Sequence, residues 1–169
     1  MFAGFLCLKL FQPFFKHFII VPTKYFYINI LNAVLCIPYM RKNSRIIQLA
    51  SSAAFMPQPY FAVYAASKSY VYSFSRALSE ELRSRRIYVT AVCPGPVDTP
   101  FFDIAEKDGK TLSIKKLTLA SPEKVVERAI ADSFHKKKIS VYNPYIRAFH
   151  VLAKIVPHQW ILFIMRFLK

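Results

Sequence analysis

The chain has 169 residues, of which 54% are hydrophobic, and a formal net charge of +15 at pH 7. This length favours one domain, and the apolar content suffices for a buried core, which excludes wholesale disorder. The three cysteines show no metal-ligand spacing and no pairing pattern, so they indicate reduced thiols in a cytoplasmic protein.

The charge is unevenly distributed along the chain. No Asp or Glu precedes Glu80 and none follows Asp132, so both ends are basic as well as rich in apolar and aromatic residues. Such ends favour an anionic membrane surface over nucleic acid as a partner, because no nucleic-acid-binding motif accompanies the charge. We therefore expect a cytoplasmic location with peripheral contact to a membrane.

Residues 1–44 form an apolar and basic N-terminal segment. Lysines and prolines interrupt its apolar runs, so no run is long enough to span a bilayer, and the pattern is not that of a signal peptide. Residues 25–40 predict a helix that ends near Pro38. The whole chain has only three glycines and therefore no glycine-rich turn of the kind that holds a dinucleotide pyrophosphate.

Residues 45–50 predict a short buried strand, after which Pro57 and Pro59 interrupt regular structure. Ser51 and Ser52 therefore lie at a strand end, where capping of the strand is the simplest role for either hydroxyl. A long amphipathic helix follows and runs to about Arg86. Its predicted inward face consists of Val71, Phe74, Ala77, Leu78 and Leu82.

Tyr64 and Lys68 lie one turn apart near the start of this helix, so their side chains share a face. A free phenol titrates near pH 10 and is a poor proton donor or acceptor at neutrality. A nearby cation favours the phenolate, so we expect Lys68 to lower the pKa of Tyr64. Ser51 could then bind a substrate oxygen while Tyr64 exchanges a proton with it.

Residues 87–93 predict a strand buried in a parallel sheet. The segment from Pro94 to Thr99 follows it, and ligands of open α/β sheets bind beyond the carboxyl ends of the strands. An ordinary proline-stiffened turn is the alternative interpretation of this segment.

A further helix is predicted to begin at Pro122 with Ser121 as its N-cap. Residues 139–142 predict the last strand. The tail, residues 145–169, predicts a pair of basic amphipathic helices, which either lie in a membrane interface or pack on the domain or a dimer partner. The predicted inward face of the helix after Ser121 consists of Val125, Val126, Ala129, Ile130 and Phe134.

Ser51, the segment Tyr64-Ala65-Ala66-Ser67-Lys68 and the segment Pro94-Gly95-Pro96-Val97-Asp98-Thr99 together resemble the catalytic half of the short-chain dehydrogenase/reductase family. The resemblance implies an α/β fold with a parallel, Rossmann-like sheet that lacks the first βαβ units. The chain is then a truncated or N-terminally rewritten relative. Residues 1–44 replace the nucleotide-binding half, residues 45–144 form the catalytic region, and residues 145–169 form a basic tail.

The resemblance further implies an NAD(P)-dependent oxidoreductase that acts on a small-molecule carbonyl/alcohol pair, with lipid-like compounds as candidate substrates. Tyr64 would be the general acid/base, Lys68 would lower its pKa and hold the nicotinamide ribose, and Ser51 would orient the substrate, with Ser52 as the alternative serine. Four residues of the later segment would line the nicotinamide: Pro94, Gly95, Val97 through its backbone and Thr99 through its hydroxyl.

The catalytic asparagine of the family would be Asn29, with Asn32 as second candidate, although a core asparagine bonded within its own helix explains either residue equally simply. Residues 101–119 correspond to the substrate lid of such enzymes. The helix after Ser51 and its predecessor form a dimer interface in many members, which suggests a homodimer. The missing glycines favour an alternative: an inactive relative that acts as a membrane-surface or protein-interaction module.

Overall fold

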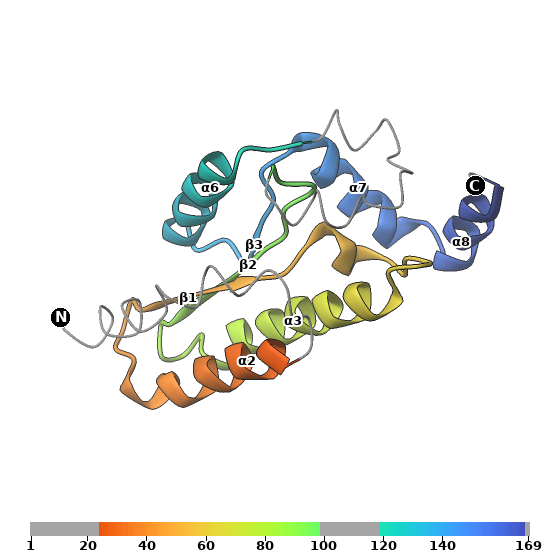
Figure 1. Ribbon diagram of the computed structural model, residues 1–169. Helices are drawn as coiled ribbons and strands as arrows, with labels where there is room; N and C mark the ends of the chain where they lie inside the picture. Colours follow the sequence, from red (N-terminus) through yellow and green to blue (C-terminus); the bar gives the residue numbers. More distant parts are fainter. Residues whose placement is uncertain (1–23, 99–118, 168–169) are drawn as a thin grey trace. The chain divides into compact units, whose positions relative to one another are not determined.

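The computed structural model describes residues 24–98 and 119–167 (Figure 1). The chain divides into two compact units, Met1–Arg41 and Lys42–Lys169. In the first unit, helix α2 spans Lys24–Cys36, and a short 3-10 helix, η1, spans Ile37–Tyr39. Helix α2 thus ends just before Pro38, as the proline predicts.

The second unit is built on a three-stranded parallel sheet with the strand order β1-β2-β3. The strands are β1 (Arg45–Leu49), β2 (Tyr88–Val92) and β3 (Ile139–Ser140). Helix α3 (Ala62–Glu81) connects β1 to β2, and helix α6 (Pro122–Phe134) connects β2 to β3. The two helices lie on opposite sides of the sheet (Figure 1). The predicted α/β fold with a parallel sheet is confirmed.

The central strand β2 is covered on both faces, which explains its continuous apolar sequence. Its register pairs Leu49 of β1 with Val92. Val92 packs with Val125 and Ala129 of α6 in one buried cluster. On the other face, α3 contacts both β1 and β2. The core of the unit therefore lies on both sides of β2.

The inward face of α3 differs from the predicted stripe. Ala77 is exposed and Phe74 is only half-buried, whereas Tyr72 and Ser75 are buried. Ser75 can lie in the core because its hydroxyl donates a 2.7 Å hydrogen bond to the Val71 carbonyl of its own helix. The prediction was correct for Val71, Leu78 and Leu82, which are buried, and wrong for Phe74 and Ala77, because polar Ser75 takes a place on the inward face.

The end of α3 also differs from the prediction. The helix ends at Glu81 with Leu82 as its C-cap, and consecutive turns follow. Arg86 has a positive φ of 55°, which turns the chain into β2. The side chain of the next residue, Ile87, is almost fully buried.

Helix α6 begins as predicted, because the Ser121 hydroxyl caps it by accepting a hydrogen bond from the Lys124 amide. The inward face was predicted correctly for Val125 and Ala129, which are buried. It was wrong for the remaining three residues, which are exposed: Val126, Ile130 and Phe134.

Two helices form the end of the chain, α7 (Pro144–Ile155) and α8 (His158–Phe167). Asn143 caps α7 by accepting a hydrogen bond from the Tyr145 amide. Across residues 24–98 and 119–167, no helix is both long and apolar enough to traverse a bilayer. The predicted lid lies outside the described residues apart from Leu119, as does the N-terminal segment up to residue 23.

A buried carboxylate joins α6 to β3. Asp132 is 2% exposed, and its oxygens accept hydrogen bonds from Lys137 at 2.8 Å, Ser140 at 2.9 Å and Arg128 at 3.0 Å. Burial by itself raises the pKa of Asp132, but the three hydrogen bonds outweigh it and the net pKa is lowered. Its contribution to stability is therefore present above the pKa of an unfolded Asp and is lost as the pH falls through the folded pKa.

We predict that Asp132→Asn lowers the free energy of unfolding at pH 7 by about 3 kcal/mol, because the partners keep their charges without the carboxylate. The difference from wild type should shrink in acid, where the wild-type carboxyl is protonated. Urea unfolding at both pH values measures this. Glu80→Gln is the control, since Glu80 pairs with Lys138 on the surface. Equal losses in the two variants contradict the prediction.

Candidate active site

Ser51 is positioned by backbone hydrogen bonds that continue the pairing of β1 with β2 beyond the strands. The amide of Ala50 donates to the Val92 carbonyl at 2.9 Å, and the amide of Ser52 donates to the Pro94 carbonyl at 2.8 Å. Because the carboxyl ends of parallel strands meet at one edge of the sheet, Ser51 lies beside the segment that follows β2.

The hydroxyl of Ser51 caps the N-terminus of the short 3-10 helix η2 (Ser52–Phe55). It accepts a hydrogen bond from the Ala53 amide at 3.2 Å and shares a hydrogen bond with the side chain of Tyr64. Ser51 is only 8% exposed. Of the two candidate serines, Ser51 is thus the one that forms a hydrogen bond with the Tyr64 side chain.

Tyr64 and Lys68 come from the first half of α3, one turn apart, as their spacing predicts. The Lys68 Nζ lies 5.7 Å from the centroid of the Tyr64 ring. It donates a 3.1 Å hydrogen bond to the carbonyl of Leu49, the last residue of β1. The structure therefore brings the hydroxyl, the phenol and the amine together at the carboxyl edge of the sheet.

The pKa values at the site differ from the expectation. Burial raises the pKa of Tyr64, and the hydrogen bond with Ser51 only partly offsets it. Burial also lowers the pKa of Lys68, against a smaller opposite effect of Cys93. The expected lowering of the Tyr64 pKa is therefore wrong for this structure, because loss of hydration raises the pKa and the Ser51 hydrogen bond offsets only part of the rise. Tyr64 is a neutral phenol at neutral pH.

Cys93 is a neighbour of the site that the sequence did not single out. It follows β2 and has no exposed surface. Burial raises the pKa of its thiol to about 12, against the opposing effects of the Lys68 charge and a hydrogen bond from the Ser51 backbone. Cys93 is therefore a neutral thiol rather than a nucleophile. A prediction that Cys93 lies beside Lys68 would have required the register of β1 with β2.

The segment after β2 is held by backbone bonding to the start of α6. Val97 forms a parallel bridge with Ala120. The Asp98 amide donates to the Ala120 carbonyl, and the Ala120 amide donates to the Pro96 carbonyl, both at 3.0 Å. Pro94 and Val97 are half-buried. This segment therefore offers a fixed backbone at the carboxyl edge of the sheet.

Gly95 has a packing reason for its lack of a side chain. A Cβ at this position would lie 2.9 Å from Cγ1 of Ile146 in α7. Any larger residue would therefore require the Ile146 side chain to shift. The role of Gly95 in cofactor binding stays a prediction beside this structural one.

Two predicted site residues stay predictions. Thr99 lies outside the described residues, and Asn29 belongs to α2 of the first unit. Over the ranges 24–98 and 119–167, no group of three or more His, Cys, Asp or Glu residues could hold a metal ion.

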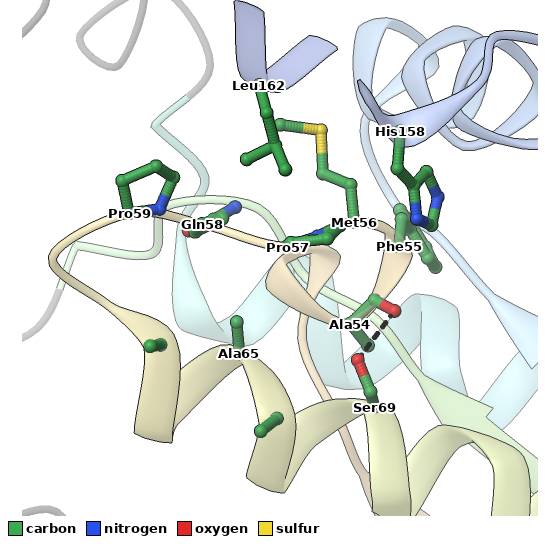
Figure 2. Close-up of a pocket in the computed structure, with 12 residues that line it drawn as sticks. Ala54, Phe55, Met56, Pro57, Gln58, Pro59, Ala65, Ser69, His158 and Leu162 are labelled. Atoms are coloured by element: carbon green, nitrogen blue, oxygen red, sulfur yellow. Dashed lines mark hydrogen bonds between the residues drawn. The ribbon is translucent and has the colours of Figure 1, made fainter. Parts of the chain in front are cut away.

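An apolar groove of about 480 Å³ lies between residues 54–59, helix α3 and helix α8 (Figure 2). Met56 and Leu162 project into it from opposite sides, and the Ser69 hydroxyl closes one wall by donating a 3.0 Å hydrogen bond to the Ala54 carbonyl. Its wall residues follow Ser51 and alternate with Tyr64 and Lys68 along α3. The groove is thus a neighbour of the polar site.

The site residues fit one end of a nicotinamide dinucleotide. An ammonium, a phenol and the fixed backbone of residues 94–97 provide donors and acceptors for a ribose and a carboxamide. The sequence offers no glycine-rich turn to hold the pyrophosphate, since the chain has only three glycines. The fit is therefore to the nicotinamide riboside end.

We predict that Ser51→Ala raises the pKa of Tyr64 further, because the hydrogen bond from Ser51 stabilises the phenolate. NMR titration of the protein with ¹³C-labelled tyrosine, with Tyr64→Phe to assign the resonance, measures the change. Ser52→Ala is the matched control and should leave the Tyr64 pKa unchanged. An equal shift in both variants contradicts the predicted geometry.

Comparisons with known proteins identify the family of the chain. The family profile described as short chain dehydrogenase matches residues 25–109, half of the chain. The chain is 40% identical over 60 residues to the 17-beta-hydroxysteroid dehydrogenase type 3 of Mus musculus, covering 36% of the chain and 20% of the relative. It is 36% identical over 117 residues to the 3-ketodihydrosphingosine reductase of Bacteroides thetaiotaomicron, covering 66% of the chain and 42% of the relative.

Solved structures show the same architecture. A short-chain dehydrogenase from Burkholderia cenocepacia in complex with NADP superposes with a TM-score of 0.54 at 19% identity, over 69% of this chain and 46% of the other. A short-chain dehydrogenase from Sphingobium yanoikuyae in complex with NADPH has a TM-score of 0.50 at 26% identity, over 57% and 36%. This chain spans less than half the length of each of these proteins. The protein belongs to the short-chain dehydrogenase family.

Proposed function

We propose that this chain carries the proton-transfer and nicotinamide riboside end of an NAD(P)-dependent oxidoreductase that acts on a carbonyl/alcohol pair. The main support is the convergence of Ser51, Tyr64 and Lys68 at the carboxyl edge of a parallel sheet. Further support comes from the relative of Sphingobium yanoikuyae, which was solved with NADPH.

Tyr64 acts as a general acid in this proposal. Its raised pKa keeps the phenol protonated at neutral pH, so the hydroxyl can give its proton to a substrate carbonyl oxygen during reduction. The phenolate that remains keeps its hydrogen bond with Ser51 and lies near the Lys68 ammonium, which favours the charge. Tyr64 regains its proton from solvent.

Lys68 and the backbone of residues 94–97 hold the nicotinamide riboside, which supplies or accepts the hydride at the substrate carbon when the dinucleotide is bound. The hydrogen bond from Lys68 to the Leu49 carbonyl keeps the ammonium at the end of β1. Ser51 then orients the substrate oxygen toward the phenol. Which of NAD and NADP is used depends on the adenosine end, which these residues do not contact in the proposal.

Two relatives carry names that refer to a hydroxysteroid and to a ketodihydrosphingosine. Both compounds are lipids with a reactive carbonyl or alcohol. Together with the apolar groove beside the site, these names support a lipid-like substrate for this chain. The substrate panel for the assay below therefore includes apolar ketones and small polar ones.

We predict that the full chain binds NADH or NADPH saturably and that Tyr64→Phe lowers turnover about 100-fold or more, because the acid is removed. Lys68→Ala should weaken dinucleotide binding. Nucleotide fluorescence measures binding, and carbonyl-dependent oxidation of the reduced nucleotide measures turnover.

The controls for this assay are Tyr145→Phe and Lys124→Ala, which change an exposed tyrosine and an exposed lysine. Unchanged turnover in Tyr64→Phe would overturn the acid role. Failure of wild type to bind either dinucleotide would overturn the redox proposal for this chain and leave a membrane or protein-interaction role.

The end of the chain supports peripheral contact with an anionic membrane. Ile155 of α7 and Trp160 of α8 are 74% and 68% exposed, and Phe163 is also exposed. Lys154 and Arg166 lie in the last turns of the two helices, and no acid follows Asp132 in the sequence. Exposed aromatic side chains beside cations fit the interfacial region of an anionic bilayer.

We predict that vesicles containing phosphatidylserine shift the emission of Trp160, the only tryptophan, to shorter wavelengths, whereas phosphatidylcholine vesicles do so less. The double variant Ile155→Ala/Phe163→Ala should weaken binding about tenfold or more. The control is Val126→Ala/Ile130→Ala, which removes exposed apolar side chains from α6. Equal binding of both variants contradicts this surface.

A homodimer through α3 remains a prediction of the family resemblance. Val63 and Tyr70 on the outer side of α3 are exposed, which agrees with an apolar contact there. The proposed chemistry does not depend on this dimer.

A further inference from the structure

The position of the Ser51 hydroxyl is tied to the short helix η2. Ser51 caps η2 by accepting a hydrogen bond from the Ala53 amide, and its carbonyl accepts a 3.0 Å hydrogen bond from the Ala54 amide. Ala53, Ala54 and Phe55 are all buried. Anything that fixes η2 therefore also fixes the hydroxyl that meets Tyr64.

Two helices hold η2 from different directions. From α3, the Ser69 hydroxyl donates to the Ala54 carbonyl, as Figure 2 shows. From α7, the ring of His150 packs on Phe55 with 4.2 Å between the ring centroids and an interplanar angle of 36°. Tyr72 of α3 meets the same phenylalanine edge-on at 5.6 Å. Phe55 is therefore enclosed between α3 and α7.

His150 and Tyr72 are also bonded to each other, with 2.9 Å between the Tyr72 hydroxyl and Nε2 of the imidazole. Burial lowers the pKa of His150, and the charges of Lys154 and Arg76 lower it further. Its ring is therefore neutral at neutral pH and can stack on Phe55 without burying a charge.

We propose that His150 is a positioning residue of the active site: by packing on Phe55 and bonding Tyr72, it fixes η2 and with it the Ser51 hydroxyl. The last part of the chain thereby supports a site whose polar groups all lie in the first part of the second unit. The importance of this support for turnover rests on the proposed function, but the geometry can be tested without it.

The test measures the pKa of Tyr64 by NMR in His150→Ala, in Ser51→Ala and in the double variant. Loosening of η2 weakens the hydrogen bond that favours the phenolate, so His150→Ala should raise the Tyr64 pKa in the same direction as Ser51→Ala. If His150 acts through Ser51, the double variant should show no further rise beyond Ser51→Ala. A merely structural residue would not show this dependence.

Conservative variants separate the two contacts of His150. His150→Phe keeps a ring against Phe55, and His150→Gln keeps a partner for Tyr72, so each should shift the Tyr64 pKa less than His150→Ala. Tyr145→Ala, an exposed position in the first turn of α7, is the control and should cause no shift. In an active chain, His150→Ala should also lower turnover about tenfold, because the Ser51 hydroxyl is less well positioned, while the control does not.

An unchanged Tyr64 pKa in a folded His150→Ala protein overturns the proposal, as does a further rise in the double variant. If His150→Ala does not fold, Tyr72→Phe replaces it in the same cycle, since it removes the hydroxyl that bonds His150 and also Arg76. Absence of turnover in wild type would overturn the proposed function alone, because the pKa comparison needs no cofactor or substrate.

Discussion

The site depends on the parallel pairing of β1 with β2 and on its continuation past the ends of both strands. The hydrogen bonds from the Ala50 and Ser52 amides bring the chain after β1 against the chain after β2. Lys68 adds a third connection by donating to the carbonyl of Leu49, the last residue of β1. The hydroxyl, the phenol and the amine therefore meet at the carboxyl ends of the paired strands, where α3 supplies Tyr64 and Lys68.

Burial controls the protonation of this site more than the nearby charge does. Tyr64, Lys68 and Cys93 all have their pKa values moved by loss of hydration toward the neutral form. The hydrogen bond with Ser51 opposes this at Tyr64, and the Lys68 charge opposes it at Cys93. A site of this kind holds a protonated phenol, which suits donation of a proton to a carbonyl oxygen more directly than its removal from an alcohol.

The helices α6 and α3 show which features of a helix the sequence predicts. The start of α6 was predictable because Ser121 and Pro122 act on the first turn alone, through a cap and a fixed φ. The exposed residues of α6 were not predictable, since Val126 and Ile130 are apolar and yet exposed. On α3, the buried Ser75 bonds its own helix, so a polar residue occupies the core and shifts the true inward face away from the hydrophobic pattern.

The sequence by itself determined the family, the parallel α/β fold and the face shared by Tyr64 and Lys68, because a local motif and a four-residue helical spacing carry that information. Only the tertiary structure decided that Ser51 is the serine that meets the phenol and that Cys93 lies beside Lys68. It also decided that His150 packs on the helix after Ser51. These facts depend on strand register and on contacts between residues far apart in the chain, and burial, which sets the pKa values, exists only once those contacts form.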